Sequence, residues 1–124
     1  MTTRFPHQKL DAWARAVDAR RMTVTALNAL PKGFADDKRQ ITRAAQAVPK
    51  LVAEGADRWA VGQKRQRFEE AIAETGEAAS GLSELTMVGA LTEAQVEPAH
   101  AMWGRVRAML IGLIRRLDSR SPQR

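Results

Sequence analysis

The sequence predicts an all-α protein that folds as an antiparallel, up-down-up-down four-helix bundle. The composition favours helices, apolar residues recur at helical spacing in four segments, and short connectors with glycine or proline separate these segments. Alanine is abundant, aromatic residues make up only 5% of the 124 residues, and tyrosine is absent. This composition argues against β-sheets, which draw on aromatic and β-branched residues. A chain of this length is expected to form one domain, residues 1–124.

The first helix is expected over residues 8–30. Its apolar residues recur at spacings of three, four and seven, namely Leu10, Trp13, Val17, Val24 and Leu27. This heptad-like pattern is typical of near-parallel helices in a bundle. Pro31, Lys32 and Gly33 then end the helix, because proline and glycine interrupt helical structure.

The second helix is expected over residues 36–61, with Asp36 or Asp37 as the N-cap that accepts a bond from a free backbone N–H. Its predicted buried face consists of Ile41, Ala44, Ala45, Val48, Leu51, Val52 and Gly55. Pro49 lies inside this pattern and predicts either a kink or a break followed by a new start. Because the apolar spacing continues beyond the proline, we expect a kinked helix.

The third helix is expected over residues 63–88. Its predicted seam consists of Phe68, Ile72, Thr75, Ala79, Leu82 and Thr86. Gly76 and Gly81 either permit close contact with another helix or are neutral. Gly89 follows the last periodic residues, where a glycine can adopt the left-handed conformation that ends a helix.

The fourth helix is expected over residues 92–118, followed by a frayed tail at residues 119–124. Thr92 and Gln95 match a capping box, in which their side chains satisfy backbone N–H groups. Pro98 predicts a slight bend or a later start of the helix. The apolar stripe consists of Met102, Val106, Met109, Leu110, Leu113 and Leu117.

The sequence contains no phosphate-binding loop, no dinucleotide-binding glycine motif and no nucleophile elbow. His7 and His100 are isolated, and one Glu-x-x-His motif ends at His100, whereas a di-iron bundle needs two. The third helix carries an acidic run of Glu69, Glu70, Glu74 and Glu77. These carboxylates suit a metal or acid–base chemistry, but a solvated face paired with nearby Lys and Arg is the favoured interpretation. We therefore expect no enzyme activity, no cofactor and no metal.

Several absences bear on where the chain works. Cysteine is missing, no apolar stretch is long enough to cross a membrane, and residues 1–9 lack the apolar core of a signal peptide. These features predict a cytoplasmic protein with no membrane partner. The net charge of +6 attracts polyanions such as nucleic acids, although a basic surface without such a partner explains the charge equally well.

Basic residues gather at the start of the third helix and along the fourth. The predicted nucleic-acid-binding residues are Lys64, Arg65, Arg67, Arg105, Arg107, Arg115, Arg116 and Arg120. Arginine can bind a phosphate through two parallel hydrogen bonds, which makes such clusters candidate phosphate contacts. The alternative is that these residues are solvated and that those in the last turns interact with the helix C-terminus.

A strip of small residues on the fourth helix predicts an oligomer interface. Gly104, Ala108 and Gly112 are spaced by four, and Ile111 lies beside them without an evident place in the core. Small residues let two helices approach closely, so a second copy of the chain could pack here. A composition rich in alanine and glycine explains the strip equally well.

A motif in the second helix is similar to one in a known family. It consists of Arg43-Ala44-Ala45, Val48-Pro49, Val52-Ala53-Glu54-Gly55 and Arg58. It resembles a motif in the four-helix-bundle proteins encoded in intervening sequences of bacterial 23S ribosomal RNA genes. Further resemblance, over most of the chain, lies in Phe5, Leu10, Trp13, Arg67-Phe68 and Gly89. Thr42 departs from the family, which often has an arginine there.

The resemblance implies a ring-like homo-oligomer, a pentamer. A relative that resembles this family in fold, the accessory variability protein of diversity-generating retroelements, binds nucleic acid and a reverse transcriptase. The resemblance therefore implies RNA or DNA, and a reverse transcriptase or another protein, as partners. The motif residues Arg43, Pro49, Glu54, Gly55 and Arg58 are expected to orient the kinked helix or a protomer contact, and Glu54 can pair with Arg58 one turn later.

Together these observations predict a non-enzymatic, oligomeric adaptor that binds nucleic acid through a basic surface. The alternative is a protein-interaction scaffold whose assembly surface is its function and which has no affinity for nucleic acid.

Overall fold

The computed structural model describes residues 4–120, which contain four α-helices and one short 3-10 helix. The 3-10 helix η1 spans Pro6–Lys9, and the α-helices are α1 (Asp11–Leu27), α2 (Ala35–Asp57), α3 (Val61–Met87) and α4 (Glu93–Arg120). No strand occurs in this part of the chain. The prediction of an all-α fold with four helices is confirmed.

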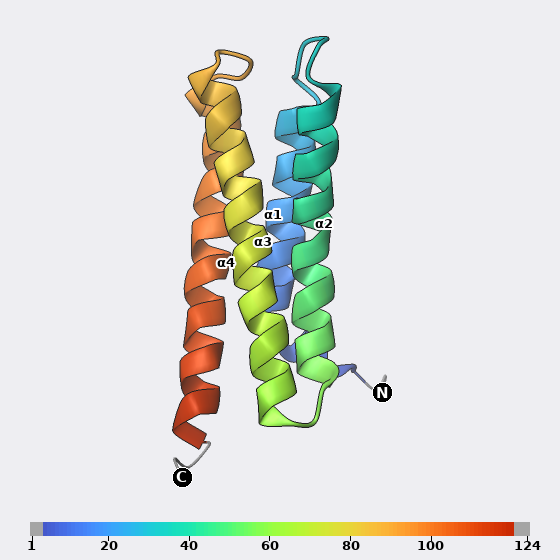
Figure 1. The fold of residues 1–124 in the computed structure, drawn as a ribbon, viewed down its shortest axis with the longest axis vertical. Helices are drawn as coiled ribbons and strands as arrows, with labels where there is room; N and C mark the ends of the chain where they lie inside the picture. The colour runs from blue at the N-terminus through green and yellow to red at the C-terminus, as the bar shows by residue number, and fades with distance from the viewer. Residues whose placement is uncertain (1–3, 121–124) are drawn as a thin grey trace.

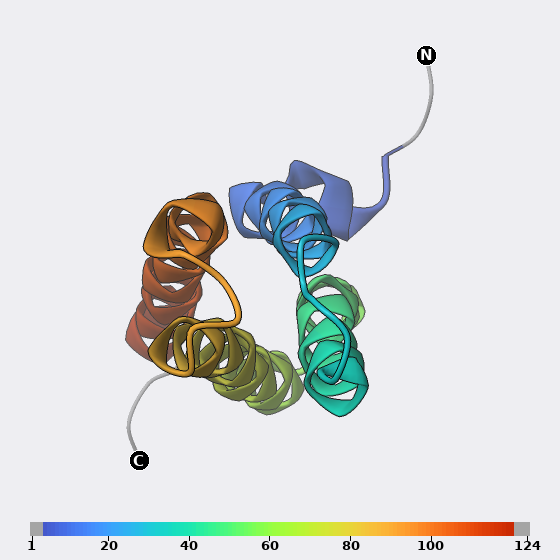
Figure 2. The ribbon, with the colours of Figure 1, turned by 90° about the horizontal axis from the view of Figure 1, so that it is seen from above.

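The four helices lie side by side around a common core, with α4 next to α1 (Figure 2). Figure 1 shows the α1–α2 and α3–α4 connectors at one end of the molecule, which we call the upper end. The α2–α3 connector, η1 and the last turns of α4 lie at the other end, which we call the lower end. Residues far apart in the sequence therefore meet at each end.

Two helix starts differ from those predicted. Residues 6–9 form η1, and α1 begins at Asp11 instead of residue 8. The N-cap of α2 is Phe34, which makes no side-chain capping bond, so the prediction of Asp36 or Asp37 as N-cap is wrong. Because α2 begins earlier than expected, both aspartates fall in its first turn, where their charge interacts favourably with the positive end of the helix.

The other helix boundaries lie within a few residues of those predicted. α2 ends at Asp57 and passes through Pro49 without interruption, which rules out the break and new start. α4 begins at Glu93 with Pro98 inside it and continues to Arg120, so the first two residues of the predicted frayed tail are helical. Residues 121–124 of that tail lie outside the described residues.

Hydrogen bonds fix the α3–α4 connector as the sequence predicted. Gly89 has a φ of 78°, its N–H donates to the carbonyl of Thr86, and the N–H of Ala90 donates to the carbonyl of Leu85 at 2.9 Å. This pattern is the Schellman motif, in which glycine avoids the strain that a Cβ would cause. The N–H of Thr92 donates to Oε1 of Gln95 at 2.9 Å, and the N–H of Gln95 donates to Oγ1 of Thr92 at 3.1 Å. The predicted capping box is thus confirmed.

The core face of α1 is made of small residues and not of the predicted heptad seam. The buried residues are Ala12, Ala16, Ala19, Thr23, Ala26 and Leu27. Leu27 is buried, and Leu10 and Trp13 are partly buried and pack against the core. Val17 is half-buried and Val24 is 42% exposed, so the predicted seam was wrong for Val24. Alanine lets α1 approach its neighbours closely, and the larger apolar side chains then lie at the flank of the helix. The predicted faces of α2 and α3 are largely buried.

A buried polar chain joins α4 to α1. The indole Nε1–H of Trp103, a fully buried residue, donates to Oγ1 of Thr23 at 2.9 Å. The Thr23 hydroxyl donates in turn to the carbonyl of Ala19 at 2.7 Å. The buried polar groups of these two hydrogen bonds all have partners, as buried polar groups usually do.

Glycines set the close approach of α2 to α3, the most extensive helix pair. A Cβ on Gly55 of α2 would stand 2.6 Å from Cε1 of Phe68, and one on Gly81 of α3 would stand 2.5 Å from Cγ1 of Ile41. Each helix thus offers a glycine to a large side chain of the other. Gly81 permits close contact, whereas a Cβ on Gly76 would meet nothing within 4 Å.

Thr23→Val removes the acceptor for Trp103 and keeps the shape of the side chain. We expect the free energy of unfolding to fall by about 1–3 kcal/mol, because a buried N–H loses its partner. The matched control is Thr25→Val, on the exposed side of the same helix, which should change this free energy by less than about 0.5 kcal/mol. Urea unfolding measures both, and equal stability of the two variants would contradict the role given to Thr23.

The two glycines of α3 predict opposite effects of the same substitution. Gly76→Ala should stabilise the protein by about 0.5–1 kcal/mol, because alanine has the higher helix propensity and space is open. Gly81→Ala should destabilise the protein, because Ile41 is buried and branched and must shift. This shift should cost about 1–3 kcal/mol, and the higher helix propensity of alanine should offset part of that cost. Thermal unfolding of both variants tests this, and a stabilised Gly81→Ala protein would refute the close approach.

Candidate nucleic-acid interface

The arginines of α4 form the most exposed part of the predicted basic surface. Arg105, Arg107, Arg115, Arg116 and Arg120 are all exposed. Within residues 4–120 none of these five side chains forms an ion pair. They come from one helix whose opposite side is held in the core by Trp103, Val106, Leu110 and Leu117. Their guanidinium groups are therefore available to an anionic ligand.

The basic residues at the start of α3 instead bond to other groups of the protein. Lys64 Nζ donates to the carbonyls of Gly55 at 3.3 Å and Ala56 at 2.9 Å, which satisfies carbonyl groups in the last turn of α2. Arg67 donates to Oε1 of Glu70 at 2.6 Å. The predicted binding residues thus form two groups: those on α3 already bond to other groups of the protein, and those on α4 form no ion pair within residues 4–120.

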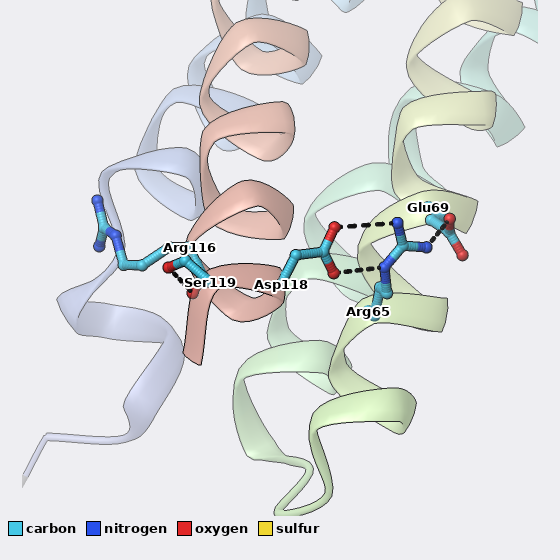
Figure 3. Close-up of polar contacts among 5 residues, drawn as sticks. All are labelled: Arg65, Glu69, Arg116, Asp118 and Ser119. Carbon is cyan, nitrogen blue, oxygen red and sulfur yellow. Dashed lines mark hydrogen bonds and ion pairs between the residues drawn. The ribbon is translucent and has the colours of Figure 1, made fainter. Parts of the chain in front are cut away.

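Arg65 bonds to two carboxylates. Its Nε donates to Oδ1 of Asp118 at 2.9 Å and its Nη2 donates to Oδ2 at 3.2 Å, while Nη1 bonds Glu69 (Figure 3). The two bonds to Asp118 connect α3 with the last turn of α4. Arg116 points away from this pair, to the other side of α4 (Figure 3).

The Arg65–Asp118 contact changes the proton affinity of both groups. The hydrogen bond from Arg65 lowers the pKa of Asp118 below its ordinary value, with the positive charge of Arg65 acting in the same direction. The same bond and the charge of Asp118 raise the pKa of Arg65 above its ordinary value. Both side chains are more than a third exposed, so water and salt weaken the pair.

The small-residue strip of α4 is open in the single chain. Gly104, Ala108 and Gly112 are exposed, and Ile111 is half-buried. A Cβ on Gly104 or Gly112 would meet nothing within 4 Å. Most of the predicted oligomer interface is therefore open within residues 4–120, with Gly112 at the edge of a hollow between α1 and α4, and the interface stays a prediction.

Two of the five motif residues of α2 have packing roles. Pro49 and Gly55 are buried, Gly55 against Phe68, while Arg43 is exposed. The expected pairing of Glu54 with Arg58 is not among the ion pairs of residues 4–120. The reason is that α2 ends at Asp57, so Arg58 adopts an extended conformation outside the helix.

The acidic side chains give no metal centre in the described part of the chain. No group of three or more His, Cys, Asp or Glu residues there could hold a metal ion. Glu69 and Glu70 pair with Arg65 and Arg67, whereas Glu74 and Glu77 form no ion pair within residues 4–120. His100 Nε2 lies 3.1 Å from Oγ of Ser83. No helix among these residues is long and apolar enough to cross a membrane.

An acidic groove lies on the side of the bundle formed by α2 and α3, near the upper end. It has a volume of about 330 Å³. Its apolar lining comes from Phe34, Ile41, Leu85 and Val88, and its carboxylates from Asp37, Glu77 and Glu84. The sequence did not indicate this groove, because its lining residues come from two helices and their shared face is visible only after folding.

Sequence reasoning also missed two exposed aromatic residues at the lower end. Trp59 is 95% exposed and Phe5 is 66% exposed. The available signal was a tryptophan beside Arg58 near the end of the predicted second helix, outside the apolar pattern that defines its buried face. The fully buried Trp103 was missed as well, although it lies one residue from the predicted stripe.

One comparison with known proteins identifies a family. The model of the family described as 23S rRNA-intervening sequence protein matches residues 8–112. The match covers all of α1, α2 and α3 and most of α4. No curated protein matches the chain.

The Arg65–Asp118 pair predicts a pH-dependent stability. The pair stabilises the fold while Asp118 is ionised, so its contribution is complete above the unfolded pKa of about 3.9 and is lost as the pH falls through the lower folded pKa. Asp118→Asn should therefore lower the urea midpoint slightly at neutral pH, and its difference from wild type should vanish in strong acid. Added salt should also reduce the difference.

The control for this prediction is Glu84→Gln, which neutralises an exposed carboxylate that has no ion pair within residues 4–120. Urea titrations across the acid range measure both variants. If Asp118→Asn and Glu84→Gln follow the same pH profile, the pair does not contribute to stability.

Proposed function

The chain belongs to the 23S rRNA-intervening sequence protein family, and from this premise we propose that it is a non-enzymatic adaptor that binds nucleic acid through the exposed arginines of α4. One observation carries the proposal: five exposed arginines lie on a single helix, and none of them forms an ion pair within residues 4–120. Arginine binds phosphate with two parallel hydrogen bonds, and each phosphate contact releases counterions. The ligand is RNA or DNA.

The proposal extends to assembly. We propose a homo-oligomer, a pentamer as the family resemblance implies, in which the strip of Gly104, Ala108, Ile111 and Gly112 contacts a second copy. The strip supports this because it is open in the single chain. The short connectors at alternating ends support an antiparallel, up-down-up-down order of the helices (Figure 1). A relation to the accessory variability protein, with a reverse transcriptase or another protein as partner, belongs to the same proposal.

A protein-interaction scaffold is the second candidate. The acidic groove between α2 and α3 favours it, because Asp37, Glu77 and Glu84 surround apolar side chains and none has an ion pair within residues 4–120. Such a groove suits a basic protein segment better than a nucleic acid. The scaffold predicts a stable assembly without affinity for RNA or DNA at physiological salt.

Charge reversal of Arg115 and Arg116 tests the adaptor. Arg115→Glu/Arg116→Glu should weaken binding to labelled RNA or DNA by about tenfold or more, because two phosphate contacts are lost. The negative slope of log K against log salt should become shallower, by about 1.4 for a single strand and about 1.8 for a duplex. Fluorescence anisotropy over a salt series measures both quantities, and the mass in solution is recorded on the same samples.

The matched control is Lys32→Glu/Arg39→Glu, which makes the same change in net charge at the upper end. Both of its residues are exposed, and the single ion pair that it breaks, Arg39 with Asp36, lies at the surface. This control should lose much less affinity. Equal losses in the two double variants, or binding that does not respond to salt, would refute a specific role for α4.

A further inference from the structure

The exposed aromatic residues of this chain gather at its lower end. The chain has three tryptophans and three phenylalanines. Trp103 and Phe68 are buried, whereas Trp59 and Phe5 are 95% and 66% exposed. Trp59 lies in the α2–α3 connector and Phe5 precedes η1, and both segments lie at the lower end (Figure 1). An indole with almost no protein contact leaves a flat apolar face open to a ligand.

The lower end is also hollow. A cavity of about 210 Å³ opens where η1, the end of α2, the start of α3 and the end of α4 meet. Its apolar lining comes from Pro6, Leu10, Ala56, Phe68, Leu113 and Leu117, and its charged lining from Lys64, Arg116 and Arg120. A second hollow of about 330 Å³ between α1 and α4 shares Leu10, Leu113 and Arg116 with it.

The charged side chains that line these hollows are mostly positive. Lys9, Lys64, Arg116 and Arg120 line them, and Asp11 is the single carboxylate among the lining residues. Arg58 stands beside Trp59, is exposed and forms no ion pair within the described residues. Flat aromatic faces, small apolar hollows and arginines therefore occur together at one end of the bundle. This combination suits a ligand that alternates planar apolar groups with negative charges.

We propose that the lower end binds the unpaired nucleotides of a single-stranded nucleic acid. One base stacks on Trp59, a neighbouring base lies over the cavity, and the phosphates between them contact Arg58, Arg116 and Arg120. Aromatic stacking and cationic grooves are the means by which proteins hold single strands without reading their sequence. Bases inside a duplex are already stacked and cannot reach Trp59 or the cavity. The proposal rests on the proposed function, because Arg116 and Arg120 belong to the basic surface of α4.

Substitutions of Trp59 test this site. Trp59→Ala should weaken binding of a short uridine-rich single strand by about tenfold, because the stacking platform is removed, whereas Trp59→Phe should keep most of the affinity. Binding of a duplex of the same length should change by less than about twofold, because phosphate contacts dominate it. Binding of the single strand should quench tryptophan fluorescence in the wild type but much less in Trp59→Phe, since Trp103 is buried and Trp13 is half-buried.

The matched control is Met87→Ala, which removes an apolar side chain that is 85% exposed at the upper end. It should leave single-strand binding unchanged. If Trp59→Ala does not weaken single-strand binding while Arg115→Glu/Arg116→Glu does, the stacking site is wrong and the proposed function stands. If the wild type binds neither single strand nor duplex, both fail. Binding of anionic lipid vesicles in place of the single strand would also overturn the proposal and identify a membrane surface as the ligand.

Discussion

Burial of the indole N–H of Trp103 without a hydrogen-bond acceptor would cost free energy, and the Thr23 hydroxyl is its acceptor in the core. Thr23 donates in turn to Ala19, so a chain of two hydrogen bonds connects α4 with the backbone of α1. With Trp103 facing inward, the rotation of α4 about its axis is set, because the side chains of one helix have fixed relative directions. Gly104, Ala108 and the five arginines then lie outside. The surface proposed to bind nucleic acid thus depends on a contact in the interior.

The pairing of α2 with α3 explains the glycine of the motif that carries the family resemblance. Gly55 leaves room for Phe68, and Arg67-Phe68 was itself part of the resemblance, so two distant parts of the pattern meet in one contact. Lys64 then donates to the carbonyls of Gly55 and Ala56 and connects the end of α2 with the start of α3. These residues place the α2–α3 connector, and therefore Trp59, at the lower end. Gly55 of the motif therefore acts in the packing of α2 against α3.

The sequence was sufficient where the signal is local. Four helices, the capping box of Thr92 and the glycine that ends α3 all follow from short-range spacing and hydrogen bonding. It was misleading for α1, where the large apolar residues form a heptad but alanines form the core, because close helix approach rewards small side chains. The lower-end cavity could not be foreseen, since its lining comes from η1, α2, α3 and α4. Ion-pair partners such as Arg65 and Asp118, 53 residues apart, were hidden for the same reason.

Net charge alone does not identify a phosphate-binding surface, because some basic side chains already bond to groups of the protein that a phosphate would have to displace. A phosphate that approaches Arg65 must displace a carboxylate already held by two hydrogen bonds, and Lys64 already serves two backbone carbonyls. A phosphate that approaches Arg116 or Arg120 displaces no carboxylate within residues 4–120. If the protein binds a nucleic acid as proposed, counterions released at these arginines would add to the affinity, whereas at Arg65 the gain would be offset by the pair that breaks. Lys64 and Arg65 at the start of α3 therefore connect this helix with α2 and α4, whereas the proposed phosphate contacts lie on α4.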